Sequence, residues 1–211
     1  MADIFDLFKQ ISTTSSASGK PEFIVAGLGN PGSEYEKTRH NAGFMAIDVI
    51  AEKSGAKVRN SKYKSLTDTV KIGDHTVLLM KPQTYMNNSG EAIKEAAQFY
   101  KIAPENIIII SDDICQAPGR MRLRKSGSAG GQKGLASIIK YLGTDAFPRI
   151  RIGVGEKPSK DYDLAAWVLG KFPEEDMAVV KNRLADTYDC VKMILDGKFD
   201  EAMGYFNGRK D

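Results

Sequence analysis

Four consecutive isoleucines, Ile107–Ile110, place the strongest constraint on how this chain can fold. β-Branched side chains favour strands, and an apolar run without alternating polar residues is typical of a strand covered on both faces. We therefore expect a central strand with helices on both sides of its sheet. The run leads into Asp112 and Asp113, which should lie at the carboxyl edge of the sheet, where open α/β folds place their sites.

Strand-like and helix-like segments alternate along the rest of the chain, which predicts the α/β fold class. The further expected strands are FIVAGL, a hairpin LTDTVKIGDHTVLLMK that turns at Gly73-Asp74, GRMRLRK and RIRIGVG. Helices are expected over about 42–54, 88–101, 135–142 and most of 173–196. Glu91 follows Asn88 by three residues, so this pair predicts a capping box at the start of the second helix.

The chain has 211 residues, 42% of them apolar and 27% charged, which is typical of one globular domain. The first twenty residues differ, because a short apolar pattern precedes the stretch STTSSASGKP. We expect residues 1–20 to form an N-terminal appendage and flexible linker, and residues 21–211 to form the domain. No apolar run approaches the roughly 18 residues that cross a bilayer, and the acidic start lacks the basic region of a signal peptide. We therefore expect a cytoplasmic protein with no membrane partner.

The cysteines and histidines do not have the spacing of a metal site. Cys115 and Cys190 are far apart in the sequence, and His40 and His75 are not in a zinc-ligand pattern. We expect reduced thiols and no structural metal.

Basic residues are concentrated in one part of the chain. Residues 119–151 contain eight lysines and arginines and a single acid, Asp145, whereas the whole chain has a net charge of only +3. A strand over GRMRLRK would point Arg120, Arg122 and Arg124 to one side. This local excess of positive charge predicts a polyanionic partner.

The turn GLGNPG, residues 27–32, fits the G-x-G-x-x-G pattern of dinucleotide-binding folds, but its surroundings do not. The polar stretch after Gly32 has no helical periodicity, Asp48 lies inside an expected helix rather than at a strand end, and Pro31 removes an N–H donor. A turn that exposes Asn30 and Tyr35 at the sheet edge agrees better with the sequence. The remaining alternative is a tight turn with no further role.

Five segments together resemble one known family: GLGNPGSEYEKTRHNAG, KPQTYMNNSGEAI, SDDICQAPGRMRLRKSGSAGG, RIRIGVGEK and VLGKF. In this order and at this spacing they resemble bacterial peptidyl-tRNA hydrolase, over roughly residues 22–206. Enzymes of this family cleave the ester that joins a peptide to the terminal ribose of a tRNA. The resemblance implies a single α/β domain with a twisted mixed sheet flanked by helices, no cofactor, peptidyl-tRNA as the partner, and a monomer.

The resemblance also implies roles for individual residues. His40 matches the catalytic histidine, and Asp112 matches the carboxylate that partners it. Hydrolysis of an ester needs only one base that activates water, and a positioned histidine raises the rate of such a reaction by roughly 10² to 10⁴. A carboxylate on the other ring nitrogen fixes the tautomer and stabilises the imidazolium. The remaining carried-over positions are substrate contacts at Asn30, Tyr35, Met86 and Asn87, and tRNA phosphate contacts at Arg122, Arg124 and Arg151.

The glycine loop departs from the family pattern. The family commonly has G-S-A-G-G-H-N-G, whereas this chain has GSAGGQKG, so Gln132 replaces a histidine and Lys133 an asparagine. The asparagine is usually assigned to substrate binding. We expect Gln132 to keep an amide contact to the substrate and Lys133 to meet a phosphate.

Two other functions fit parts of the sequence. A relative on the same scaffold could bind RNA without hydrolysing it, as in the organellar splicing-factor branch, but the joint presence of His40, Asp112, Asn30 and Asn87 favours an enzyme. A nucleotide-dependent oxidoreductase would need the dinucleotide motif that the GLGNPG turn does not complete.

Overall fold

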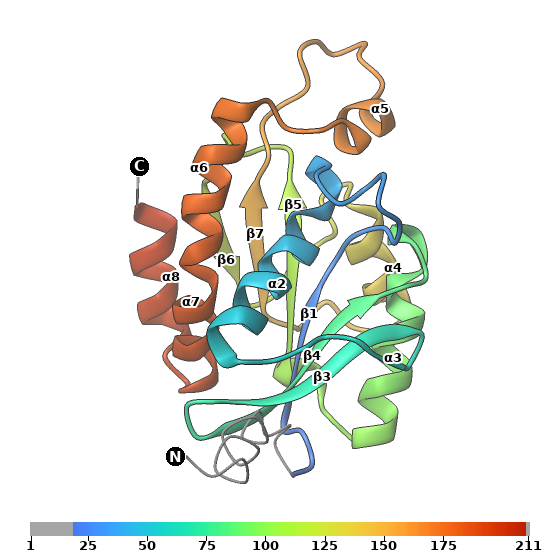
Figure 1. Ribbon diagram of the computed structural model, residues 1–211, viewed down its shortest axis with the longest axis vertical. Coiled ribbons are helices and arrows are strands. Elements are labelled where there is room, and N and C mark those ends of the chain that lie inside the picture. The colour runs from blue at the N-terminus through green and yellow to red at the C-terminus, as the bar shows by residue number, and fades with distance from the viewer. Residues whose placement is uncertain (1–18, 210–211) are drawn as a thin grey trace, which may run out of the picture.

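The computed structural model describes residues 19–209, so nearly all of the predicted appendage over residues 1–20 lies outside the described residues. The described chain forms one α/β domain with a seven-stranded mixed sheet between helices (Figure 1), as predicted. The strands, in the order β2-β3-β4-β1-β5-β7-β6, are β1 Phe23–Gly27, β2 Asn60–Lys62, β3 Ser65–Ile72, β4 His75–Pro82, β5 Ile107–Asp113, β6 Met121–Arg124 and β7 Arg149–Gly153.

Helices cover both faces of the sheet (Figure 1). One face packs against α2 Ala42–Ser54, α6 Glu174–Ala185, α7 Thr187–Leu195 and α8 Phe199–Gly208, and the other packs against α3 Ser89–Tyr100 and α4 Lys133–Leu142. The short helix α5 Leu164–Leu169 lies beyond the carboxyl ends of the strands, at the top of Figure 1. The part of the chain that the structure describes also contains three 3-10 turns: η1 Arg39–Asn41, η2 Met86–Asn88 and η3 Pro104–Asn106.

The sheet reverses its strand order at β1. β1 pairs in parallel with β4 on one side and with β5 on the other. The connection through α2 covers one face of the sheet, and the connection through α3 covers the other, because right-handed crossovers in opposite directions fall on opposite faces. Such a switch point opens a crevice beyond the carboxyl ends of the strands.

The isoleucine strand is the buried centre that the sequence predicted. All seven residues of β5 are buried, with Ile108 and Ile110 in the core beneath α2 and Ile107 and Ile109 in the core beneath α3 and α4. The hairpin at Gly73-Asp74 also forms as predicted.

Three short elements and one cap differ from the predictions. The predicted capping box is wrong, because Asn88 makes no side-chain cap and Glu91 instead pairs with Lys64 in the turn between β2 and β3. β2, α5 and α8 were not predicted. β2 is fully exposed and three residues long, and α5 has six residues, so neither leaves a clear periodic pattern.

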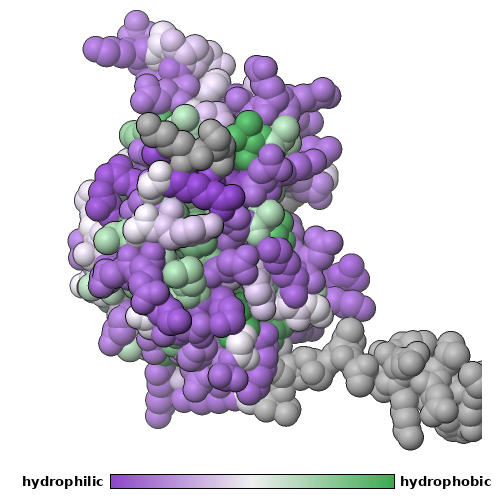
Figure 2. Space-filling view, turned by 90° about the vertical axis from the view of Figure 1, so that its left-hand side faces the viewer, coloured by the Kyte–Doolittle hydropathy of each residue, from purple (hydrophilic) through white to green (hydrophobic). Residues whose placement is uncertain are grey.

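The outer surface over α6, α7 and α8 is mostly hydrophilic, with small separate hydrophobic patches (Figure 2). None of the helices within residues 19–209 is both long and apolar enough to cross a bilayer.

Both cysteines are free, Cys115 on the surface and Cys190 in the core, where burial raises the pKa of the thiol.

α2 lies unusually close to the sheet at Gly43. A Cβ atom there would be 2.3 Å from the Leu28 backbone nitrogen and 2.4 Å from the Ile110 carbonyl oxygen. Backbone atoms cannot move aside as a flexible side chain can. Because Gly43 has no side chain, the N-terminus of α2 can lie this close to β1 and β5. The preceding turn, η1, is held close to these strands in the same way.

We predict that Gly43→Ala destabilises the protein by about 3 kcal/mol or more, because the methyl group overpacks against backbone. Gly204→Ala is the matched control, since Gly204 lies inside α8 with no atom within 4 Å of its added Cβ. The control should stabilise the protein by about 0.5–1 kcal/mol through helix propensity. Urea unfolding measures both changes, and equal effects would contradict the packing argument.

Candidate active site

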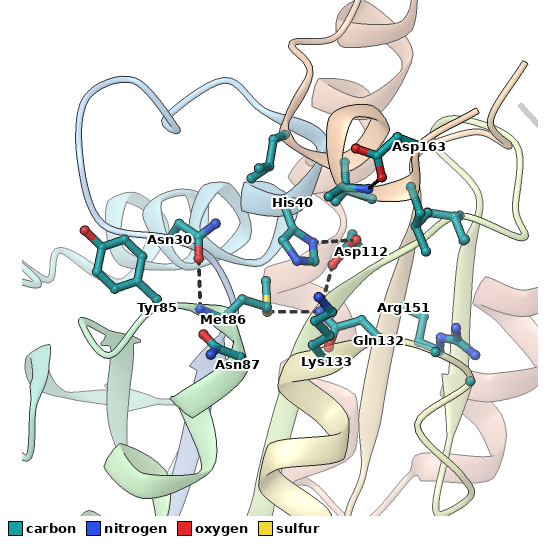
Figure 3. A pocket seen from close by; sticks show the side chains of 17 residues that line it. Asn30, His40, Tyr85, Met86, Asn87, Asp112, Gln132, Lys133, Arg151 and Asp163 are labelled. Atoms are coloured by element: carbon teal, nitrogen blue, oxygen red, sulfur yellow. Dashed lines mark hydrogen bonds and ion pairs between the residues drawn. The ribbon is translucent and has the colours of Figure 1, made fainter. Parts of the chain in front are cut away.

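A cavity of about 560 Å³ lies at the switch point, beyond the carboxyl ends of β1, β4 and β5. The turns that follow these strands form one side of it, and the glycine loop and α5 form the other (Figure 3). Its lining residues are Asn30, His40, Tyr85, Met86, Asn87, Asp112, Ile114, Gly130, Gly131, Gln132, Lys133, Arg151, Asp163, Leu164, Ala165, Val168 and Leu169.

His40 and Asp112 form a buried pair in this cavity. The pleat of β5 turns Asp112 toward the same face as Ile110, beneath α2, and His40 lies in the turn η1 that precedes α2. His40 Nδ1 is 2.9 Å from Asp112 Oδ2, which confirms the predicted approach of the two side chains. A carboxylate can only accept, so Nδ1 donates in this contact, and in the neutral imidazole Nε2 is then the nitrogen with the free lone pair. Nε2 has no hydrogen bond to any of residues 19–209.

The neighbouring carboxylate, Asp113, forms an ion pair with Arg151 instead of contacting His40. The pleat turns it to the opposite face of the sheet, where its Oδ2 lies 3.2 Å from Arg151 Nε. The two atoms are close enough for an ion pair but are not aligned for a hydrogen bond. Asp113 Oδ1 accepts from the backbone N–H of Cys115, which holds the start of the following loop. The resemblance assigned a role to Asp112 alone, and no role was predicted for Asp113.

Asn30 is 8% exposed, so the prediction that this turn exposes it is wrong. Its Oδ1 accepts from the backbone N–H of Met86 at 2.8 Å, and the Asn41 side chain makes two hydrogen bonds to the Asn30 backbone. These bonds join the turn after β1 to η1 and η2. The Nδ2 group of Asn30 remains on the cavity side (Figure 3). Asn41 was not singled out from the sequence, although it directly follows His40.

The segment after β4 is strained where it enters the cavity. Tyr85 has φ of 56°, a conformation that is costly for a residue with a side chain, and the residue is 54% exposed. The next two residues turn into η2, which buries Met86 and leaves Asn87 exposed in the lining. Tyr85, Met86 and Asn87 therefore form one side of the cavity, which includes the predicted positions Met86 and Asn87.

Gln132 and Lys133 lie at the start of α4, where the glycine loop ends. The Gln132 amide makes three contacts within the protein: Nε2 donates to Asp112 Oδ1 at 2.9 Å and to Met86 Sδ at 3.1 Å, and Oε1 accepts from the Leu135 N–H at 2.7 Å. Figure 3 shows the resulting chain from Asn30 through Met86, Gln132 and Asp112 to His40. Lys133 lines the cavity beside it.

The arginines of β6 and β7 share one face of the sheet. In the antiparallel register Arg122 lies opposite Arg151 and Arg124 opposite Arg149, so all four side chains leave on the face of α4 and the glycine loop. Arg151 lines the cavity, whereas Arg122 and Arg124 lie outside its lining. Arg149 is buried and donates to the carbonyl groups of Gly127 and Ser128, and its burial lowers the pKa of the guanidinium.

Helix α5 covers the cavity and is tied to the turn that carries His40. The Arg39 guanidinium lies 3.6 Å from the centre of the Trp167 ring and donates to the carbonyl groups of Trp167 and Lys171. Burial lowers the pKa of the Arg39 guanidinium. Asp163 caps α5 by accepting from the N–H groups of Ala165 and Ala166. Sequence reasoning missed the lining residues of α5 and its cap, Asp163, although an aspartate before LAAWVL is an N-cap signal.

Not every predicted site residue lines the cavity. Tyr35 lies in the turn before η1, where its carbonyl group accepts from the Thr38 hydroxyl, and its side chain is outside the lining. Among the described residues, no three His, Cys, Asp or Glu side chains converge as metal ligands would.

Comparisons with known proteins agree on one family. The family described as peptidyl-tRNA hydrolase matches residues 24–211. A protein of that name from Lachnospira eligens is 48% identical over 186 residues, which cover 88% of this chain and 100% of that protein. The corresponding protein from Clostridium novyi is 47% identical over 188 residues, which cover 89% of this chain and 99% of the relative. The crystal structure of peptidyl-tRNA hydrolase from Acinetobacter baumannii superposes with a TM-score of 0.84 at 37% identity, covering 92% of this chain and 99% of that one.

We predict that Arg39→Lys loosens α5 without unfolding the domain. Lysine keeps the charge but loses the planar stack on Trp167, which is worth about 1–2 kcal/mol when desolvated. Hydrogen exchange of the α5 amides should therefore accelerate by about tenfold or more. Arg59→Lys, at an exposed arginine, is the control and should change nothing. Unchanged α5 exchange in the Arg39 variant would refute the anchor.

Proposed function

Because the chain belongs to the peptidyl-tRNA hydrolase family, we propose that it hydrolyses the ester between peptide and tRNA with a water molecule activated by His40. The observation that carries this mechanism is the buried His40–Asp112 pair, whose Nδ1–Oδ2 contact leaves Nε2 open to the cavity. An unprotonated imidazole nitrogen is a suitable base near neutral pH. Asp112 holds the ring and stabilises the imidazolium that forms when water loses its proton.

The amides around the cavity are suited to hold the acyl group. Asn30 keeps its Nδ2 group toward the cavity while Oδ1 is fixed by the Met86 N–H, so its orientation is set before substrate binds. Asn87 presents a second amide from η2. We assign these two residues and Met86 to the ester end and the peptide backbone. Amides can donate to a carbonyl oxygen without competing for the proton that His40 takes.

Positive charge beside the cavity is suited to hold the tRNA. Arg122, Arg124 and Arg151 leave the same face of the sheet, and Lys133 lines the same cavity as Arg151 and the His40–Asp112 pair. We assign all four to backbone phosphates, which position a nucleic acid without reading its sequence. Tyr35, outside the lining, is assigned to the terminal nucleotide at the rim.

No step of this mechanism requires a metal or a cofactor, and one chain supplies every residue of the network. We therefore propose a metal-independent monomer that acts in the cytoplasm, where tRNA is reused. An RNA-binding protein without activity is the second candidate, because the basic face alone would explain RNA binding. It does not explain why a buried carboxylate orients a histidine at the cavity.

We predict that His40→Ala lowers kcat on peptidyl-tRNA by roughly 10² to 10⁴ while tRNA affinity stays nearly unchanged. His75→Asn is the matched control, because His75 lies at the start of β4, where its partners are Phe23 and Asp196. Peptide release from purified peptidyl-tRNA in the presence of EDTA measures both variants. A near-normal kcat in the His40 variant would remove His40 as the base.

A second prediction concerns the basic face. Replacing Arg122 and Arg124 with Gln should flatten the slope of log affinity against log salt by about one to two and raise KM for every tRNA alike. Lys71→Gln with Lys192→Gln is the control pair, since both lysines lie beside the β3–β4 hairpin at the opposite edge of the sheet. An unchanged slope in the arginine pair would exclude this face as the tRNA site and leave the catalytic assignment intact.

Lys133 tests the departure from the family pattern. If its ammonium meets a phosphate near the terminal ribose, Lys133→Ala should raise KM and flatten the salt slope by about one or less. Lys133→Arg should keep both values. If neither value changes in the alanine variant, Lys133 does not contact a phosphate.

A further inference from the structure

The orientation of the Gln132 amide is fixed by the helix that follows it. Oε1 accepts from the Leu135 N–H as the N-cap of α4, and this N–H can only donate. Nε2 must therefore point the other way, toward Asp112 Oδ1. A flipped amide would place its oxygen against a carboxylate and its NH₂ group against an N–H, which leaves both ends repelled. The cap thus guarantees that a donor faces Asp112.

Asp112 is 2% exposed, and each of its carboxylate oxygens has one side-chain donor. His40 Nδ1 donates to Oδ2 and Gln132 Nε2 donates to Oδ1, both at 2.9 Å. The carboxylate is attached to a strand, so its one freedom is rotation about its own side-chain bonds. Two donors on opposite oxygens prevent that rotation. Removing one would leave a buried charge partly unpaired and free to turn away from His40.

We propose that Gln132 is a positioning residue for hydrolysis: it acts through Asp112 to hold the imidazole of His40, rather than by touching the substrate. The inference rests on the proposed function of the same site. The three hydrogen bonds of the Gln132 side chain already use both ends of its amide within the protein. Its neutrality also matters, because a cationic donor would compete for the negative charge of Asp112 that stabilises the imidazolium.

Two variants separate the contact with Asp112 from the capping of α4. Serine caps helices well but is too short to reach Asp112, so Gln132→Ser keeps the cap and loses the donor. Its kcat should fall about tenfold or more, as expected for losing a hydrogen bond to a charged group, with KM nearly unchanged. Gln132→His retains an N–H donor of sufficient length and should keep kcat near the wild-type value. If the serine variant does not fold, Gln132→Asn, which caps but is one carbon shorter, takes its place.

A spectroscopic measurement on the substrate-free protein makes the test independent of turnover. The Nδ1 proton of His40, identified by its loss in His40→Ala, should give a slowly exchanging downfield NMR signal in the wild type and in Gln132→His. It should broaden or vanish in Gln132→Ser. A wild-type protein that releases no peptide would refute the proposed function, while this signal still reports on positioning. The inference is overturned if the serine variant keeps its His40 signal and kcat, or if KM alone rises, as a direct substrate contact would require.

Discussion

The arrangement of the cavity depends on one buried carboxylate, Asp112, at the end of the central strand. Asp112 is placed by the pleat of β5, and its charge can be tolerated only because donors occupy both oxygens. Those donors come from segments far apart in the sequence, the turn before α2 and the N-terminus of α4. The switch in strand order at β1 brings these segments to the same crevice. The geometry of His40, the proposed base, therefore depends on how the sheet and both helical layers meet.

Neighbouring groups show how the same network extends outward. Asn41 ties the His40 turn to the turn after β1, and Asn30 ties that turn to Met86. Gly43 lets α2 lie against the backbone of β1 and β5, so a change of one methyl group there would shift the histidine. These contacts join backbone groups and neutral amide side chains around the cavity. Positive charge in the lining comes from Lys133 and Arg151, and Arg122 and Arg124 leave the sheet on the same face as Arg151, where we propose that the tRNA binds.

Much of this arrangement could be predicted from the sequence, for reasons that are local. The isoleucine run specified a strand covered on both faces, and its end at Asp112 specified the carboxyl edge. The alternation in GRMRLRK correctly placed Arg122 and Arg124 on one side. The burial of Asn30 and the contact of Gln132 with Asp112 were not predictable in this way, because both depend on partners more than ten residues away. α5 was missed because a six-residue helix has too few turns to show a period.

The central claim is that water, activated at His40, attacks the acyl carbon of the ester. The most direct test is a single turnover of purified protein on peptidyl-tRNA in water labelled with heavy oxygen, with EDTA present. Attack at the acyl carbon predicts that the label enters the carboxylate of the released peptide and that the tRNA leaves unlabelled. A requirement for added metal, a label on the tRNA, or release of an unlabelled peptide would contradict it.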